Sequence, residues 1–304
     1  MISVTLSEYK NFGKCVEITN GKIIARITVD LGFRIIYYGT ADGRNIMCED
    51  ISRVMCKEHE YFDRNYGKGT KWYIYGGHRL WKSPEDMSCY VPDNFPIEYK
   101  IIDGGAEFYC PPQPTTLLSF ALKVTMNSRG HLTVTHYIKN CGAFPYTCAV
   151  WALSVLKTGG VEIIPLNKTD TTLLPNNNIT IWPYTKLNDK RLKFTDKYIF
   201  IRQDVNASGP LKIGAAIKSG AAAYNVDNLL FIKRFPYING SVYPDNNCNF
   251  ETYTNDKMLE LETLSPLYTI DPDMTVSHTE VWELKDGRNV RLNDVSADKA
   301  LFNI

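Results

Sequence analysis

The sequence predicts an all-β protein built as a sandwich or a barrel. Short runs in which apolar and polar residues alternate recur along the 304 residues, and Gly, Pro and Asn separate them. Helical periodicity is scarce, and strands do not alternate with helices as they do in a parallel α/β sheet. We expect one domain over residues 1–304, because no flexible linker, low-complexity tract or fixed-period repeat divides the chain.

The first strands are expected at residues 15–19, 22–30 and 33–38. Asn20-Gly21 separates the first two and favours the tight turn of a β-hairpin. Ile23, Ala25 and Ile27 then share one face of the second strand, because side chains on a strand alternate between its two faces. A short helix is expected at residues 50–61, with Asp50 as its N-cap, and another after Ser83-Pro84.

The middle of the chain repeats the hairpin pattern, with strands at residues 119–126 and 131–139 around a turn at 127–130. His136 shares an apolar face with Val134 and Ile138, so we expect it to be a hydrogen-bonded core residue. Further strands are expected at residues 161–166, 179–184, 198–202, 211–217, 229–234, 258–264 and 275–284.

Composition excludes several classes of function. Lys and Arg number 34 against 33 Asp and Glu, so no excess positive charge is present to drive binding to nucleic acid. The N-terminal residues lack an apolar signal segment and no run is long enough to span a membrane, so we expect a cytoplasmic protein. The eight cysteines form no C-x-x-C pair and are expected to be reduced thiols. Nucleotide and metal motifs are missing, and we expect neither a cofactor nor a metal ion.

The segment Gly76-Gly77-His78-Arg79-Leu80-Trp81 combines two glycines with an imidazole, a guanidinium and an indole. A planar ring that can stack on a sugar, beside a fork of hydrogen-bond donors, suits a carbohydrate pocket. The alternative is an ordinary turn, with Arg79 in a surface ion pair and Trp81 in the core. We favour the pocket, because a Gly-Gly pair at a strand end has no evident packing purpose.

Two carboxylates lie in the segment Leu259-Glu260-Leu261-Glu262. On a strand, Glu260 and Glu262 would share one face, with the leucines on the other. Simple alternation would place both in water, whereas a carboxylate inside a cleft would be a candidate general base.

These segments carry a resemblance to the galactose mutarotase (aldose 1-epimerase) superfamily. The likeness is specific in Leu261-Glu262-Thr263, Pro272-Asp273, His278-Thr279-Glu280-Val281-Trp282, Tyr243-Pro244-Asp245 and the Gly-Gly-His-Arg-Leu-Trp segment, and loose elsewhere between residues 18 and 284. The resemblance implies a β-supersandwich with a cleft for a small-molecule carbohydrate. It also implies that Glu262 matches the family's catalytic glutamate and that Arg79 corresponds to a sugar-binding arginine.

One family position differs. Trp151 stands where the family has its acid histidine. An indole can stack on a sugar but cannot protonate it, so the acid would have to come from elsewhere, and His78 is the candidate.

Two functions remain open. The first is an aldose 1-epimerase-like isomerase, with Glu262 as base, His78 as acid, and Arg79, Trp81 and Trp151 holding the sugar. The second is a non-catalytic carbohydrate-binding protein that retains the cleft.

Overall fold

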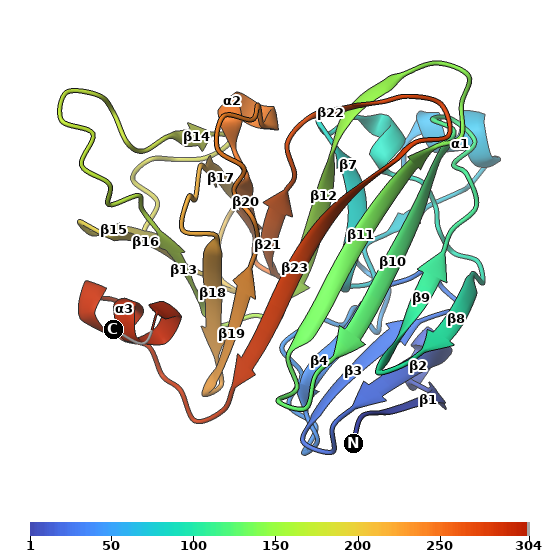
Figure 1. Cartoon of the computed structure of the whole chain (residues 1–304), viewed down its shortest axis with the longest axis horizontal. Helices are drawn as coiled ribbons and strands as arrows, with labels where there is room; N and C mark the ends of the chain where they lie inside the picture. The colour runs from blue at the N-terminus through green and yellow to red at the C-terminus, as the bar shows by residue number, and fades with distance from the viewer. Residues whose placement is uncertain (303–304) are drawn as a thin grey trace.

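Two large antiparallel β-sheets form most of the molecule. The structure is a computed structural model and describes residues 1–302. Within these residues the sheets contain eleven and ten strands, and a separate two-stranded ribbon accompanies them. Figure 1 shows the two sheets stacked as layers, with the short helices at their edges. The expected all-β sandwich is confirmed.

The first sheet contains, in spatial order, β1 (Ser3–Glu8), β2 (Lys14–Thr19), β3 (Ile23–Thr28), β4 (Ile35–Thr40), β7 (Gly77–Ser83), β12 (Tyr146–Leu156), β21 (Leu259–Leu264), β20 (Phe250–Thr254), β17 (Leu211–Ala215) and β14 (Ile179–Ile181), and β22 (Tyr268–Ile270) pairs with β12. The second sheet contains β15 (Leu192–Phe194), β16 (Tyr198–Arg202), β13 (Val161–Pro165), β18 (Ala221–Val226), β19 (Leu229–Arg234), β23 (Thr275–Lys285), β11 (Leu132–Asn140), β10 (Leu118–Met126), β9 (Gly105–Tyr109) and β8 (Glu98–Ile102).

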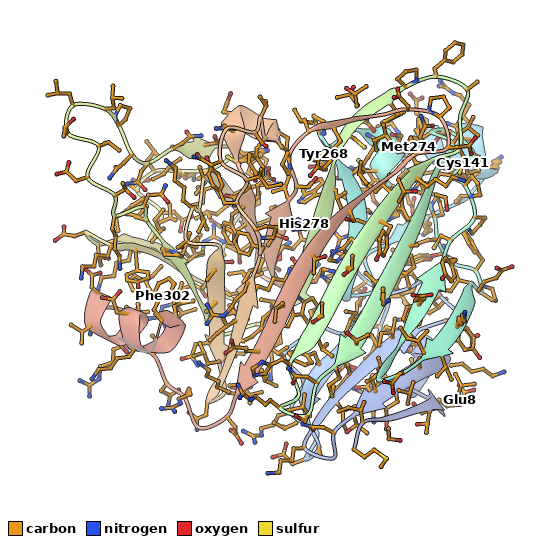
Figure 2. The ribbon with its side chains drawn as sticks, in the orientation of Figure 1. Glu8, Cys141, Tyr268, Met274, His278 and Phe302 are labelled. Carbon is orange, nitrogen blue, oxygen red and sulfur yellow. The ribbon has the colours of Figure 1, made fainter. Side chains whose placement is uncertain are left out.

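The remaining elements are short. They are the ribbon of β5 (Cys56–Lys57) and β6 (Trp72–Tyr73), the helices α1 (Glu60–Tyr66), α2 (Pro244–Asn247) and α3 (Asp294–Phe302), and 3-10 turns at Lys10–Phe12 and Met87–Cys89. Figure 2 shows Glu8, at the end of β1, and Phe302, at the end of α3, on opposite sides of the molecule. Among the described residues, no helix has the length and apolar character that a membrane crossing requires.

The main core lies between the two sheets. Every second residue of β10 and β11 is buried there, as the alternation in the sequence predicted. β12 differs, because its last nine residues are all buried. The strand therefore has apolar residues on both faces and shows no period-two signal, which is why sequence analysis did not find it.

The strands and hairpins expected from alternation are confirmed. β2 pairs with β3 around Asn20-Gly21, and β10 pairs with β11 around residues 127–130. His136 lies in the core as expected, and it is fully buried with both ring nitrogens in hydrogen bonds.

The two expected helices are wrong in position. The Asp50 carboxylate accepts hydrogen bonds from the amides of Val54 and Met55, but this cap closes a turn, and α1 begins only at Glu60. Ser83 is the last residue of β7 and not a helix cap. In both places tertiary strand pairing, of β5 with β6 and of β7 with β12, overrides the local capping signal.

Candidate functional site

Strand alternation in β7 places Arg79 and Trp81 on the outer face of the first sheet. Leu80, between them, packs into the core between the sheets, whereas Trp81 belongs to a second apolar cluster with Trp151 and Leu153. The register pairs Trp81 with Trp151 and Arg79 with Leu153. These residues therefore share one surface, on the side of the sheet that the second sheet does not cover.

Three neighbouring strands add charged side chains to this surface. β21 contributes Glu260 and Glu262, β20 contributes Glu251 and Tyr253, and β17 contributes Lys212. The register sets Glu251 opposite Glu262, Tyr253 opposite Glu260, and Lys212 opposite Tyr253. The expectation that Glu260 and Glu262 share a face is met, but both are buried, so simple exposure to water is excluded.

Arg79 and Glu260 form a buried ion pair. Arg79 Nη2 donates to Glu260 Oε1 over 2.9 Å, and the two side chains are only 5% and 9% exposed. The guanidinium also lies 4.5 Å from the ring centroid of Trp81 and 5.5 Å from that of Trp72. Its Nε and Nη1 atoms are buried without a hydrogen-bond partner among the described residues. Arg79 thus retains donors that a ligand could use.

Lys212 forms the centre of a second charged group. Its Nζ lies 2.7 Å from Glu251 Oε2 and 3.5 Å from Glu262 Oε2. The ammonium also lies 4.7 Å from the ring centroids of both Trp151 and Trp182. Trp151 donates its indole N–H to Glu262 Oε2 over 2.9 Å. Glu262 is therefore held beneath Trp151 and Lys212, and it is fully buried.

Burial and the charge shared with Lys212 act in opposite directions on the pKa values of this group. Burial raises the pKa of Glu262 to about 7, and Lys212 only partly opposes this. Burial likewise holds the pKa of Glu251 well above its usual range, against the opposing charge of Lys212. Burial acts to lower the pKa of Lys212, but Glu262 and Glu251 outweigh it and the net pKa is raised. The lysine stays charged, while the two carboxyl groups hold a proton at higher pH than usual.

A cavity of about 400 Å³, which we call the aromatic chamber, opens above this surface. Its aromatic lining consists of Trp72, Trp81, Tyr90, Trp151, Trp182, Tyr184 and Tyr253. Its charged lining consists of Arg79, Glu85, Lys212 and Glu260. A wall of indole and phenol rings around a few charged groups can hold a ring with one apolar face and several hydroxyls.

A second cavity of about 390 Å³ adjoins the aromatic chamber, and we call it the acidic chamber. Both chambers are lined by Glu85, Tyr90, Trp151, Trp182 and Lys212. The residues that line only the acidic chamber are Lys57, Pro84, Asp86, Met87, Asp245 and Glu251. Together the two chambers form a cleft with two compartments.

A third cavity, of about 210 Å³, also touches Arg79 and Trp81. Most of its wall is apolar and includes Phe33, Phe95 and Phe120 together with four prolines. It offers few groups that could select a polar ligand or do acid–base chemistry, so we place the candidate site in the two chambers.

The predicted site residues separate into two groups. Arg79, Trp81 and Trp151 all line the aromatic chamber, although each is largely buried. Glu262 does not line the chamber, but it accepts a hydrogen bond from Trp151, which does.

His78, the candidate acid, does not join them. Alternation along β7 turns His78 inward, where it is fully buried and hydrogen-bonded to Ser154 and His136 over 2.9 and 2.6 Å. It lines none of the three cavities described above.

The Gly-Gly pair also has a packing purpose after all. Gly76 and Gly77 have φ values of 92° and 68°, a region that favours glycine. A Cβ at Gly76 would lie 2.1 Å from the carbonyl oxygen of Cys48, and one at Gly77 would lie 2.6 Å from that of Ile35. The glycines therefore let neighbouring backbone approach closely, and the pair is not by itself a sign of ligand binding.

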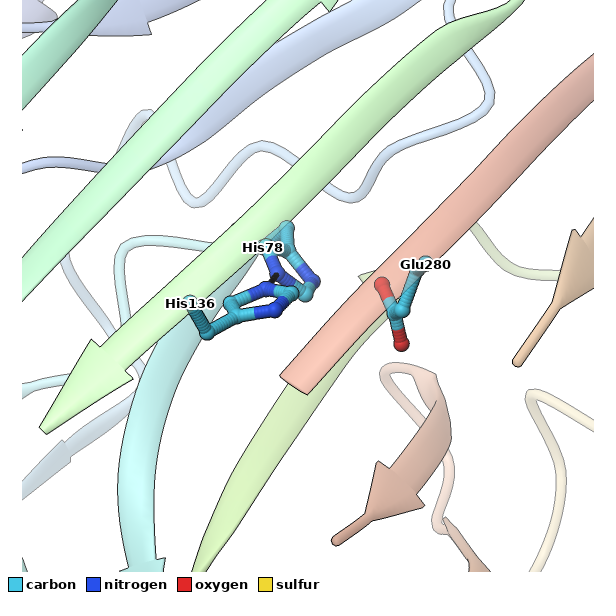
Figure 3. Close-up of side chains that lie close together, drawn as sticks. All are labelled: His78, His136 and Glu280. Atoms are coloured by element: carbon cyan, nitrogen blue, oxygen red, sulfur yellow. Dashed lines mark hydrogen bonds between the residues drawn. The ribbon is translucent and has the colours of Figure 1, made fainter. Parts of the chain in front are cut away.

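His78, His136 and Glu280 lie close enough together to hold a metal ion, with ligand atoms within 4.8 Å of one another. Figure 3 shows the two imidazoles facing each other with Glu280 beside them. Each atom already has a protein partner: Glu280 accepts from Lys233 and from Trp282, and His136 Nδ1 donates to the backbone oxygen of His278.

Burial lowers the pKa of both His78 and His136, so the imidazoles are neutral. Figure 2 places His278, the next member of this network, on β23. The two ring nitrogens of His78 and His136 that face each other are bonded at 2.6 Å, and Lys233 already neutralises Glu280. The arrangement is a satisfied polar network in the core.

Four residues of the two chambers were not expected from the sequence: Lys212, Glu251, Trp182 and Tyr253. A signal was available for the first two, because each is a charged residue inside an otherwise apolar or neutral strand, as Glu260 and Glu262 are. Charge inside a strand that turns out to be buried marks either a structural ion pair or a site. The positions of Trp182 and Tyr253 carry no comparable local signal.

No family model and no curated protein matches this sequence. Solved structures do share its fold. The Slr1438 protein from Synechocystis aligns with a TM-score of 0.56 at 12% identity, over 94% of this chain and 96% of that one. A galactose mutarotase-like protein from Lactobacillus casei aligns with a TM-score of 0.54 at 10% identity, over 89% and 100%. Another from Clostridium acetobutylicum aligns with a TM-score of 0.53 at 11% identity, over 94% and 99%. The expected galactose mutarotase type of β-sandwich is confirmed.

Proposed function

We propose that this protein binds a carbohydrate in the aromatic chamber. The observation that carries the proposal is the grouping of seven aromatic side chains around the Arg79–Glu260 pair. A sugar ring offers C–H bonds on its faces and hydroxyls on its rim. Stacking on indoles with hydrogen bonds to a fixed guanidinium and carboxylate matches both features.

The free donors of Arg79 support the same proposal. Nε and Nη1 are buried without partners, and burying such groups costs free energy unless a ligand or water satisfies them. The fold that this chain shares with galactose mutarotase-like proteins agrees with a sugar ligand, since those proteins are named for sugar chemistry.

Trp182→Ala tests the proposal with little risk to folding, because Trp182 is only partly buried and lies in the loop after β14. We expect about a tenfold loss of affinity for whichever monosaccharide binds, since one aromatic contact contributes roughly 1 kcal/mol beyond its buried area. Calorimetric titration with a panel of aldoses measures it. Phe194→Ala is the matched control, because Phe194 is 51% exposed and lines neither chamber. If no aldose binds the wild-type protein, the proposal fails.

A second candidate, aldose 1-epimerase activity, is favoured by Glu262. Its pKa of about 7 suits a general base at neutral pH, but Glu262 lines neither chamber and is connected to the cleft through its partners Trp151 and Lys212. Anomer exchange needs a base that removes the proton of the C1 hydroxyl and an acid that protonates the ring oxygen. Because His78 is on the other face of β7, that acid would have to be Lys212 or Glu251, which line the cleft.

NMR saturation transfer on freshly dissolved anomers distinguishes the two candidates. The enzyme must accelerate exchange above the spontaneous rate in water. If sugars bind but none interconverts faster with protein than without it, the cleft binds without catalysis.

A further inference from the structure

The two chambers adjoin along one wall, which Trp151, Trp182 and Lys212 build. Lys212 lies equally far, 4.7 Å, from the two indole centroids, so the ammonium sits between the rings at the junction. All three residues line both cavities. A ligand held against these rings in the aromatic chamber therefore has a second compartment of about 390 Å³ beside it.

The chemistry of the acidic chamber differs from that of its neighbour. Four carboxylates line it against two lysines. Two of the carboxylates are already used: Asp86 accepts from Lys82 over 2.8 Å and Glu85 accepts from the hydroxyl of Tyr90. Glu85 and Asp86 are also exposed, whereas Asp245 is half-buried and Glu251 is buried, so the acceptors that the chamber shields from water are those of Glu251 and Asp245.

Glu251 holds an acceptor without a partner. Its Oε2 pairs with Lys212, but its Oε1 is buried and has no hydrogen-bond partner among residues 1–302. The residue is only 1% exposed and lines the acidic chamber. A carboxyl oxygen left without a partner at this depth costs free energy unless a hydrogen-bonding group of a ligand enters the chamber.

Asp245 is fixed beside it by an unusual turn. Asp245, Asn246 and Asn247 have successive φ values of 50°, 60° and 73°. The hydroxyl of Thr180 donates to the backbone oxygen of Asp245 over 3.1 Å, and Ser83 donates to its carboxylate over 3.3 Å. The second oxygen of that carboxylate is available to the chamber.

We propose that the acidic chamber is a second saccharide subsite. The ligand is then a saccharide of at least two units, whose second unit forms hydrogen bonds to Glu251 and Asp245 through its hydroxyl or ammonium groups. This inference rests on the proposed function, because the first unit occupies the aromatic chamber. Excess carboxylate in the second chamber disfavours a unit that bears phosphate or carboxylate.

Matched saccharides test the subsite. The probes are glucose, cellobiose and maltose, then glucosamine and its β-1,4 dimer, with glucose 6-phosphate as the anionic probe, each titrated calorimetrically. We expect at least one dimer to bind tenfold or more tightly than its own monomer. The glucosamine dimer distinguishes ammonium from hydroxyl as the donor, because it shares its linkage with cellobiose. A preference for ammonium would weaken with added salt.

Asp245→Asn tests whether the higher affinity of a dimer comes from the acidic chamber. Asparagine tolerates the positive φ, keeps an acceptor for Ser83 and removes the charge. It should reduce the dimer-to-monomer affinity ratio at least threefold and leave monomer affinity unchanged, because Asp245 does not line the aromatic chamber. Tyr184→Ala should instead weaken monomer and dimer alike, because Tyr184 lines the aromatic chamber and not the acidic chamber.

The outcomes separate this inference from the proposed function. If monomers bind but no dimer binds more tightly than its monomer, the second subsite is refuted and the first stands. The same holds if Asp245→Asn leaves the dimer-to-monomer affinity ratio unchanged. Tighter binding of glucose 6-phosphate than of glucose would also contradict it. If no probe binds at all, both proposals fall.

Discussion

Replacing Glu262 with glutamine should change how the stability of the protein depends on pH. Glutamine keeps the shape of the side chain and an oxygen that can accept the Trp151 indole N–H, but it cannot titrate. Lys212 keeps its closer partner, Glu251, at 2.7 Å. The variant therefore removes the titration of one buried carboxyl group while its ion-pair partner stays in place.

The magnitude follows from the pKa values. Burial raises the pKa of Glu262 from an ordinary 4.5 to about 7. Below about pH 4.5 the carboxyl group is protonated in both the folded and the unfolded chain, so its titration does not change the free energy of unfolding. Between these pH values the folded chain holds a proton that the unfolded chain has released, so stability falls as pH rises. At 1.4 kcal/mol per pKa unit, the full loss above pH 7 is about 3 kcal/mol.

Urea unfolding followed by tryptophan fluorescence, at several values between pH 5 and pH 8, measures this effect. The free energy of unfolding of Glu262→Gln relative to wild type should increase with pH across the window, by about 2 to 3 kcal/mol in total. Glu107→Gln is the control. A hydrogen bond from Tyr109 lowers the pKa of Glu107, so it is ionised throughout this window and its difference from wild type should stay constant. A constant difference for Glu262→Gln as well would refute the assignment of a raised pKa.

Two further predictions concern the ion pair and the glycines. Arg79→Met should destabilise the protein by roughly 3 to 5 kcal/mol, because Glu260 stays buried without its cation, and adding Glu260→Gln should restore most of that loss. Urea unfolding of the two variants tests this prediction. If Arg79→Met alone were as stable as wild type, the buried ion pair would be contradicted. Calorimetry on the double variant should show sugar affinity ten- to a hundredfold lower, because the charged donor is gone. Gly77→Ala should cost at least about 2 kcal/mol, since φ is 68° and the new Cβ would lie 2.6 Å from a backbone oxygen of β4; a shift in melting temperature of less than about 2 °C would be too small for that strain.

The sequence alone determined most of the strands. β10, β11 and β23 each bury every second side chain over much of their length, so the signal that forms them is present in any short window of the chain. The same signal predicted that Glu260 and Glu262 share a face, but it did not predict β7, which is buried along its whole length. Alternation is a local property, because each side chain follows its neighbours along a single strand.

The tertiary structure decided which face meets the ligand and which residues meet across strands. From the sequence, His78 and Arg79 were expected in one site, whereas the pairing of β7 and the packing of the second sheet place His78 in the core and Arg79 in the aromatic chamber. Glu251 and Lys212 reach Glu262 through the pairing of β20 with β21 and with β17, which depends on contacts between distant segments. The pKa values of Glu251, Lys212 and Glu262 depend on the same strand pairing, because the residues that bury and charge each of them lie on other strands. The sequence therefore specified the strands, while the sheet created the two chambers and the charge shared within them.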